Sequence, residues 1–443
     1  MTILLLTRYA VYLFFSIFFS SDNSQIPIHY FHMLSLYIFF HNSVGHEILN
    51  IVNIFLHYPV GIMASPLLLL GFIMLAYSLA RIKTEEILVG RSGFFPFFLK
   101  ILPGHMVIYG RTGSGKSNTA KLIASMLSKR IPVLILDWAG EYDLDNFEKL
   151  VPGENFQINP LEYISGDLSE HIDFLVDLFG DVFQFSDPMK FMFRRTLNQL
   201  FKDMRAPTLV QLLEKLDAIP LKSYYDHETK MAIKRRLAHL IEGRALRTFV
   251  GSSHSLGHLF STNIVIDLSV FRSVHIKILF TLILLKMLYD YVVSRKRFSR
   301  KVKHVVIVEE AYNVIPYRRL NYLPSIGERL FAELRKYGEC VIAVSQSPVE
   351  TSWSLAKNAR IVIIHNVLDK DVDSIFGIKA NPPFSKLSTG EAYVIQDNKT
   401  RYVKFFKYKN KKSRREITKI SRIKFFHVLS FERKNHDSYI EIE

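Results

Sequence analysis

Apolar and polar positions follow two alternating patterns after residue 100. Short apolar runs, typical of buried parallel strands, are separated by longer segments with helical periodicity. The runs that predict strands are 106–110, 131–138, 263–269, 304–310, 339–346 and 359–366. The segments that predict helices include 116–130, 275–293 and 325–338. This alternation predicts an α/β fold built on a mainly parallel, doubly wound sheet.

Two regions depart from this alternation. From about 164 to 250 the pattern is helical throughout, which predicts an all-helical subdomain inserted into the α/β core. The runs 391–397 and 401–408 predict a closing hairpin. The apolar segment 278–288 resembles a membrane helix, but its short length and Lys286 favour a helix in the protein core.

The first eighty residues have the pattern of a membrane region. Residues 59–80 contain no charge, and residues 2–20 contain only Arg8, so each stretch suits a spanning helix of about 20 residues. The shorter apolar segments 28–40 and 48–58 leave open whether there are two or three spans. A cleaved signal peptide is the alternative for residues 2–20, although no small-residue cleavage site stands out after them.

Basic residues set the orientation of these spans. No Lys or Arg lies between the two stretches, whereas Arg81, Lys83, Arg91 and Lys100 follow the second. Since Lys and Arg accumulate on the cytoplasmic side, residues from 81 onward are expected in the cytoplasm. The sequence therefore predicts a multi-pass protein of the cell membrane with a cytoplasmic domain.

Charge and cysteine content narrow the function. The chain of 443 residues has a net charge of +16, and the residues after position 80 carry 56 basic and 39 acidic side chains. This excess suggests a polyanionic partner, either nucleic acid or anionic lipid, with general solubility as the alternative. Cys340 is the only cysteine, which excludes an intramolecular disulfide and a cysteine zinc site.

A nucleotide-binding motif lies between the first predicted strand and helix. Residues 110–117 read GRTGSGKS, a complete G-x-x-x-x-G-K-S. Its glycines let backbone N–H groups surround phosphates, and the following helix directs its positive end at them. We expect Lys116 to reach the β- and γ-phosphates and Ser117 to ligate Mg²⁺, so the predicted cofactors are ATP and Mg²⁺. The predicted nucleotide-binding residues are Gly110, Arg111, Thr112, Gly113, Ser114, Gly115, Lys116, Ser117 and Asn118.

Polar side chains at the ends of other strands complete a candidate catalytic site. Glu309 and Glu310 follow an apolar strand, so Glu309 is expected to hold Mg²⁺ and Glu310 to position or deprotonate the attacking water. Two solvated glutamates at a strand end are the structural alternative. Gln346 ends the next strand and could contact the γ-phosphate or the water. Glu141 either polarises water or belongs to a structural turn.

Arg335 is a candidate that cannot serve its own chain. It lies 25 residues beyond Glu310 at the end of a predicted helix, too far along the chain to reach the site in cis. It could act as an arginine finger toward a neighbouring subunit. An arginine on the surface is the alternative.

Several motifs occur in the order of a known family. They are GRTGSGKSNTA, LILDWAGEYD, FQINPL, VVIVEEAYNVIP, ELRKYGECVIAVSQSP and STGEAYVI, spread over about residues 100–400. Together they resemble the HerA–FtsK superfamily of DNA-pumping ATPases, particularly its HerA and conjugation-ATPase branches. The resemblance implies a P-loop NTPase of the RecA/FtsK kind that assembles as a homo-hexamer and moves DNA through a central pore without sequence preference. It also implies Walker A roles for Lys116 and Ser117, Walker B roles for Glu309 and Glu310, a sensor role for Gln346 and an in-trans role for Arg335.

The sequence departs from the family pattern at two points. Walker B usually reads Asp-Glu, so the longer Glu309 could reach the metal through water. The β-barrel of soluble HerA helicases has no room in residues 81–104, and predicted spans stand in its place. The chain therefore looks most like membrane-anchored members: conjugative coupling ATPases and, most closely, crenarchaeal DNA-import ATPases of the CedB kind. Such an arrangement implies the membrane and a separate channel protein as partners, and its composition is compatible with an archaeal host.

These observations predict a domain order and leave several functions open. The expected parts are a transmembrane region (1–82), a first ATPase part (83–163), a helical insertion (164–255), a second ATPase part (256–408) and a basic tail (409–443). The preferred hypothesis is a motor that transfers or imports DNA across the membrane. A viral packaging ATPase, a secretion or pilus ATPase that moves protein, and a nucleotide-gated scaffold with negligible turnover are the alternatives.

Overall fold

The computed structural model describes residues 86–101, 103–221, 223–295, 298–299, 301–318 and 324–410. The predicted spans 2–20 and 59–80, and all of the basic tail beyond residue 410, lie outside these residues. Within the described ranges, no helix has both the length and the apolar character required to cross a membrane.

The described strands form one eleven-stranded sheet. They are β1 (Glu86–Ser92), β2 (Phe95–Lys100), β3 (His105–Tyr109), β4 (Val133–Asp137), β5 (Glu148–Leu150), β6 (Ile264–Asp267), β7 (His304–Val308), β8 (Glu339–Ser345), β9 (Ala359–Ile364), β10 (Glu391–Gln396) and β11 (Lys399–Phe405). Their order is β2-β1-β11-β10-β9-β3-β8-β7-β4-β6-β5. Pairing is parallel from β9 to β5 and antiparallel from β9 to β2, so the prediction of a mainly parallel α/β sheet is confirmed.

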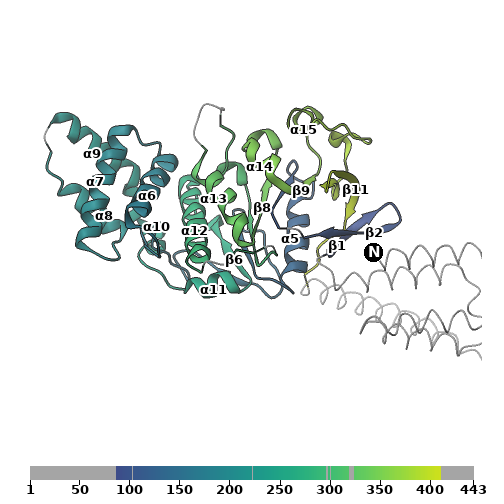
Figure 1. Ribbon diagram of the computed structural model, residues 1–443, viewed down its shortest axis with the longest axis horizontal. Coiled ribbons are helices and arrows are strands. Elements are labelled where there is room, and N and C mark those ends of the chain that lie inside the picture. The colour runs from purple at the N-terminus through teal and green to yellow at the C-terminus, as the bar shows by residue number, and fades with distance from the viewer. Residues whose placement is uncertain are drawn as a thin grey trace, which may run out of the picture. The chain divides into compact units, whose positions relative to one another are not determined.

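Helices occupy the predicted segments between these strands, and two further helices, α14 and α15, were not predicted. The described helices are α5 (Lys116–Leu127), α6 (Leu168–Phe183), α7 (Asp187–Asp203), α8 (Leu209–Asp217), α9 (Tyr224–Leu237), α10 (Gly243–Thr248), α11 (Leu256–Ser261), α12 (Val274–Ser294), α13 (Ile326–Leu334), α14 (Trp353–Asn358) and α15 (Asp369–Phe376). Helices α6 to α11 all lie between β5 and β6 in the chain, and Figure 1 shows α6 to α9 gathered as one group beside the sheet. The described residues between 164 and 250 contain no strand.

Two hydrophobic cores lie on opposite faces of the sheet. Along β3, Met106 and Ile108 pack on the face that α5 covers, while Val107 and Tyr109 pack on the face covered by α12 and α13. This alternation follows from the two-residue repeat of a strand, and every residue of β3 is buried because both faces are covered. The carboxyl ends of the parallel strands are thereby fixed side by side, which is where loops that bind ligands arise.

Helix α12 is a core helix, as its sequence predicts. Most of its length is buried, and Lys286 forms an ion pair with Asp290 one turn later. The predicted closing hairpin is β10–β11. The hairpin β1–β2 was not predicted, and it extends the sheet because β1 pairs with β11.

Candidate nucleotide-binding site

The glycine-rich loop follows the central strand β3 and leads directly into α5. Gly113 and Gly115 have φ angles of 79° and 108°, in the region that favours glycine. A β-carbon on Gly115 would lie 2.9 Å from the backbone nitrogen of Gly390, so a larger residue would displace the neighbouring loop. The backbone conformation of the loop therefore requires glycine at these two positions of the motif.

The amino end of α5 is open to an anion. Gly115 is the N-cap, no side chain caps the helix and its first turn has no acidic residue. The first N–H groups of a helix have no partner within it and carry partial positive charge, so this end suits a phosphate. The ammonium group of Lys116 donates to the carbonyl of Arg111 at 3.1 Å and thus lies over the same loop. Burial lowers the pKa of Lys116, opposed by the carboxylates of Glu310 and Glu309.

A cleft of about 330 Å³ lies over this loop, a volume suited to a small ligand. The predicted residues that line it are Thr112, Gly113, Gly115, Lys116, Ser117, Asn118, Glu141, Glu309 and Glu310. Ser345, at the end of β8, also lines the cleft, and its buried hydroxyl has no hydrogen-bond partner among the residues that the structure describes. A buried polar atom without a partner is uncommon in proteins and is consistent with a ligand that supplies one.

The other three residues of the motif, Gly110, Arg111 and Ser114, do not line the cleft and hold the loop through backbone hydrogen bonds. The N–H of Gly110 donates to the carbonyl of Ser345 at 3.2 Å, and the N–H of Arg111 donates to the carbonyl of Asn366 at 2.8 Å. Ser114 is buried, and its carbonyl accepts from the N–H of Gly390 at 2.9 Å. These contacts attach the loop to the ends of neighbouring strands.

The two glutamates after β7 have different environments. Glu309 is only 5% exposed and lies beside Asp137, which ends the adjacent strand β4. Burial, followed by repulsion from Asp137, raises the pKa of Glu309 to about 8. Glu310 has a φ of 48°, unusual for a residue other than glycine, and such backbone strain is often found at functional sites. The amide Nε2 of Gln346 lies 3.5 Å from its carboxylate, so the structure brings together Glu310 and Gln346.

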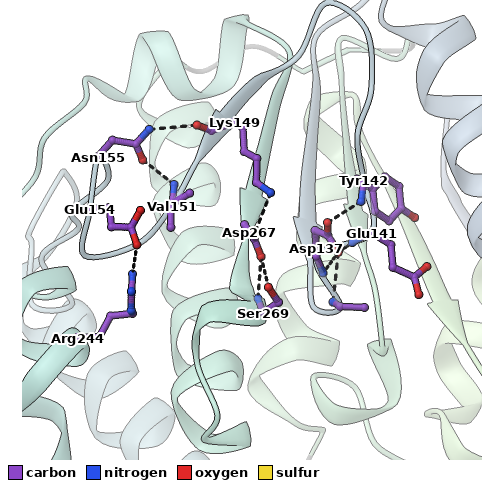
Figure 2. A network of polar contacts seen from close by, with 12 residues as sticks. Asp137, Glu141, Tyr142, Lys149, Val151, Glu154, Asn155, Arg244, Asp267 and Ser269 are labelled. Atoms are coloured by element: carbon purple, nitrogen blue, oxygen red, sulfur yellow. Dashed lines mark hydrogen bonds and ion pairs between the residues drawn. The ribbon is translucent and has the colours of Figure 1, made fainter. Parts of the chain in front are cut away.

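Asp137 holds the loop that carries Glu141 (Figure 2). Its Oδ1 accepts from three consecutive N–H groups, those of Ala139, Gly140 and Glu141, and its Oδ2 accepts from Tyr142 at 2.8 Å. Glu141 itself reaches the cleft but is exposed, with its carboxylate 3.9 Å from Lys121. Asp137 therefore has a structural role, and Glu141 is placed by it.

Asn118 connects the site to the end of the sheet. Its Nδ2 donates to the carbonyl of Phe406 at 2.9 Å, and its Oδ1 accepts from the N–H of Tyr408 at 2.8 Å. The amide therefore joins α5 to the segment that follows β11, although the residue also lines the cleft.

Besides Ser345, two further contributors were missed by sequence reasoning. The hydroxyl of Thr389 donates to the carbonyl of Gly113 at 3.0 Å. His365, just after β9, lies 3.1 Å from the hydroxyl of Thr119 and 2.9 Å from the carbonyl of Glu391. Burial lowers the pKa of His365 to about 4, so it supports the loop as a neutral ring. The signal available in the sequence was its place at the carboxyl end of an apolar strand; that this strand neighbours β3 is known only from the structure.

Arg335 lies at the amino ends of the parallel strands, opposite the carboxyl ends that carry the cleft. Its side chain is beside Gly104, just before β3 begins. Burial lowers the pKa of His105, and the charge of Arg335 lowers it slightly further. The P-loop starts only after the five residues of β3, a distance of about 16 Å at the rise of a strand. Arg335 is exposed, and its guanidinium forms no hydrogen bond or ion pair with the described part of the chain. The structure therefore does not bring Arg335 to the cleft of its own chain.

The sequence of this region matches a known family. Residues 97–288 match the family model described as the central domain of helicase HerA (DUF87). This segment includes β3, the P-loop, β4, the helical group and most of α12. This part of the chain is therefore similar to the central domain of HerA helicases. No curated protein matches the chain.

Solved structures share the fold at low sequence identity. VirB4 of Thermoanaerobacter pseudethanolicus superposes with a TM-score of 0.60 at 18% identity, over 73% of this chain and 96% of VirB4. The plasmid coupling protein TrwB in complex with ADP and Mg²⁺ gives a TM-score of 0.52 at 13% identity, over 76% of this chain and 94% of that one. TrwB has also been solved with a non-hydrolysable ATP analogue. These relatives support the predicted fold, and their ligands agree with the predicted cofactors ATP and Mg²⁺.

Proposed function

We propose that this protein is a membrane-anchored, hexameric ATPase that couples ATP hydrolysis to transport of DNA across the cell membrane. Three observations support the proposal: the cleft over the P-loop, the match to the HerA central domain, and the excess of basic side chains after residue 80. A pore that threads a phosphate backbone requires Lys and Arg along its wall and no readout of base sequence. The apolar stretches 2–20 and 59–80 supply the proposed anchor.

The position of Arg335 is the observation that carries the assembly. The cleft lies at the carboxyl ends of the parallel strands, whereas Arg335 lies at their amino ends. An exposed guanidinium without a partner among the described residues is available to a neighbouring copy. In a ring where the amino ends of the strands in one subunit face the carboxyl ends in the next, every cleft would receive an arginine from a neighbouring subunit.

The residues of the cleft fit a magnesium nucleotide. Lys116 and the open end of α5 would bind the phosphates, and Ser117 and Glu309 would hold Mg²⁺. The metal neutralises phosphate charge when bound. Because Glu309 has a pKa of about 8 in this structure, its carboxyl group would release a proton on binding the cation. Glu310, positioned by its turn and by Gln346, would orient the water that attacks the γ-phosphorus and accept its proton.

The test is ATP turnover by the purified full-length protein in detergent, with and without DNA. We expect turnover to rise with single- or double-stranded DNA of any sequence. The variant Glu310→Gln should lose turnover and keep ATP binding, since it alters the residue that handles water. Glu154→Gln is the matched control, because Glu154 is exposed, pairs with Arg244 and lies outside the cleft.

The same assay separates the alternatives. Stimulation by an unfolded polypeptide and not by DNA would identify a protein-moving ATPase. ATP binding without turnover would favour the nucleotide-gated scaffold. A strictly monomeric particle in every nucleotide state would contradict the proposed ring, and recovery of the chain in the soluble cell fraction would contradict the anchor.

A further inference from the structure

Three side chains with metal-binding chemistry meet at the base of the helical group. They are Glu148, the first residue of β5, His254 in the loop before α11, and His258 in α11. Their potential ligand atoms all lie within 4.8 Å of one another. None of the three lines the nucleotide cleft, and β5 is the edge strand, separated from β4 by β6.

The three side chains are held by contacts on several sides. The Nε2 atom of His258 lies 2.8 Å from the Glu148 carboxylate. The ring of His254 stacks on His258, with centroids 5.6 Å apart, and packs against Phe156 at 5.5 Å. The Ser253 hydroxyl lies 2.8 Å from Nδ1 of His254, which leaves Nε2 of that ring as the donor atom for a metal. Orientation of one ring nitrogen by a hydrogen bond is the usual arrangement around metal-binding histidines.

The neighbouring strand residue points elsewhere. Lys149 binds the carboxylate of Asp267 at 2.8 Å, as Figure 2 shows. Because successive side chains of a strand project to opposite faces, Glu148 is directed away from that ion pair and toward the two histidines. The cluster is therefore separate from the polar network that joins β5 and β6.

We propose that Glu148, His254 and His258 form a site for one Zn²⁺ ion. Two imidazoles and one carboxylate are a donor set that zinc prefers, with water in the fourth position. Ligands about 2.1 Å from a tetrahedral metal are about 3.4 Å apart. The present separations range from 2.8 Å to at most 4.8 Å, so small side-chain rotations would complete the site.

Such an ion would connect the two chain segments that join helices α6 to α10 to the sheet. Glu148 precedes α6 to α10 in the chain, whereas His254 and His258 follow them. The two segments are already joined by the N–H of Gln157, which donates to Ser253 Oγ at 2.9 Å. A metal across the same junction would stabilise the helical group against the edge of the sheet, because binding to the folded state alone raises its stability.

The experiment is a Zn²⁺ titration of the purified full-length protein after removal of metal with a chelator. We expect one tight equivalent for the unaltered chain and a rise in its thermal midpoint on saturation. His258→Gln and Glu148→Gln should weaken binding at that site by at least about 100-fold and abolish the thermal shift, since each removes a ligand. His227→Gln is the matched control, because His227 lies on α9 beside only one carboxylate, that of Glu228 at 3.8 Å.

ATP binding by the same preparations checks that each variant is folded, since the cleft is separate from the cluster. The proposal is overturned if the unaltered chain binds no tight equivalent. It is also overturned if His258→Gln or Glu148→Gln retains both the equivalent and the thermal shift. In that case the cluster is an ion pair stacked against a histidine.

Discussion

The two ends of the parallel strands contrast in how their polar groups are satisfied. At the amino ends, buried His105 uses both ring nitrogens, because Nε2 donates to the carbonyl of Phe331 and Nδ1 accepts from Val341. At the first residues of β7 and β8, His304 Nδ1 and Glu339 form a buried pair at 2.7 Å, while Nε2 of His304 has no hydrogen-bond partner among the described residues. At the carboxyl ends, no side chain caps α5, the Ser345 hydroxyl has no partner among the described residues, and the acidic Glu309 is buried next to another carboxylate.

This difference distinguishes structural polarity from binding polarity. Buried polar groups that find partners within the chain are compatible with a stable fold. A buried polar group without a partner lowers the free energy of unfolding until a ligand supplies the missing hydrogen bond or charge. The carboxyl ends are therefore the expected place for an anion and a cation. Arg335 is the exposed exception at the amino ends, because its guanidinium has no partner in the described ranges, and we propose that it acts on a neighbouring subunit.

The exception gives the largest expected effect. Arg335→Ala should lower ATP turnover by about 1,000-fold, the magnitude associated with an arginine finger, and leave ATP affinity within a few-fold. Steady-state turnover and nucleotide titration measure the two quantities. Arg329→Ala is the control, because Arg329 lies on α13, the helix directly before Arg335, but pairs with Asp177 at 2.7 Å.

Mixing of subunits tests whether the arginine acts in trans. Coexpressed Arg335→Ala and Lys116→Ala chains should recover part of the turnover, since some clefts then combine an intact P-loop with an intact arginine. Absence of recovery, with mixed particles verified by mass, would assign Arg335 a role within its own chain or none.

The next effect concerns the unsatisfied carboxyl ends. Lys116→Ala should weaken ATP binding by about 100-fold, because it removes charge-assisted hydrogen bonds to phosphate. Equilibrium titration with a fluorescent ATP analogue measures the loss. Lys121→Ala, one turn further along α5 and facing Glu141, should change the affinity far less. Equal losses in both variants would contradict a specific role for Lys116.

Acid should destabilise the domain through its buried histidines. Burial lowers the pKa of His105 and of His365 to about 4, below the value of about 6.5 in an unfolded chain. The unfolded state therefore binds more protons between these values, and stability falls as the pH drops from about 6.5 to 4. At pH 5 the loss is about 2 kcal/mol for each histidine.

Thermal midpoints measured across this pH range test the effect. His105→Gln should reduce the pH dependence even if it lowers the midpoint at neutral pH, because a glutamine does not titrate. The unaltered chain, measured in parallel over the same pH range, provides the control. A profile that His105→Gln does not alter would contradict the assignment.

The smallest effect is expected in the loop that carries Glu141. Asp137→Asn replaces a carboxylate that accepts four backbone N–H groups with an amide that has one acceptor oxygen. We expect a loss of about 1 to 2 kcal/mol in stability and a few-fold rise in the KM for ATP. The thermal midpoint and steady-state kinetics measure these changes, and an unchanged midpoint would show that the loop is held by other contacts.

Local patterns predicted the parts of the fold whose signal is contained in one segment. The apolar runs identified the central strands, and the charge in 278–288 separated α12 from a membrane helix. The hairpin β1–β2 was missed because β1 gains its place by pairing with β11, more than 300 residues later in the chain. The three-residue strand β5 was missed for the same reason, since it depends on pairing with β6.

The candidate site shows the same division. The sequence by itself determined the P-loop, because its glycines, lysine and serine act through the backbone path between one strand and one helix. Only the tertiary structure decided that Glu309 is buried against Asp137, that His365 supports the loop, and that Arg335 lies at the amino ends of the strands, away from the cleft. Those facts depend on which strands are neighbours, and strand order arises from packing of both faces across the whole domain rather than from any local sequence pattern.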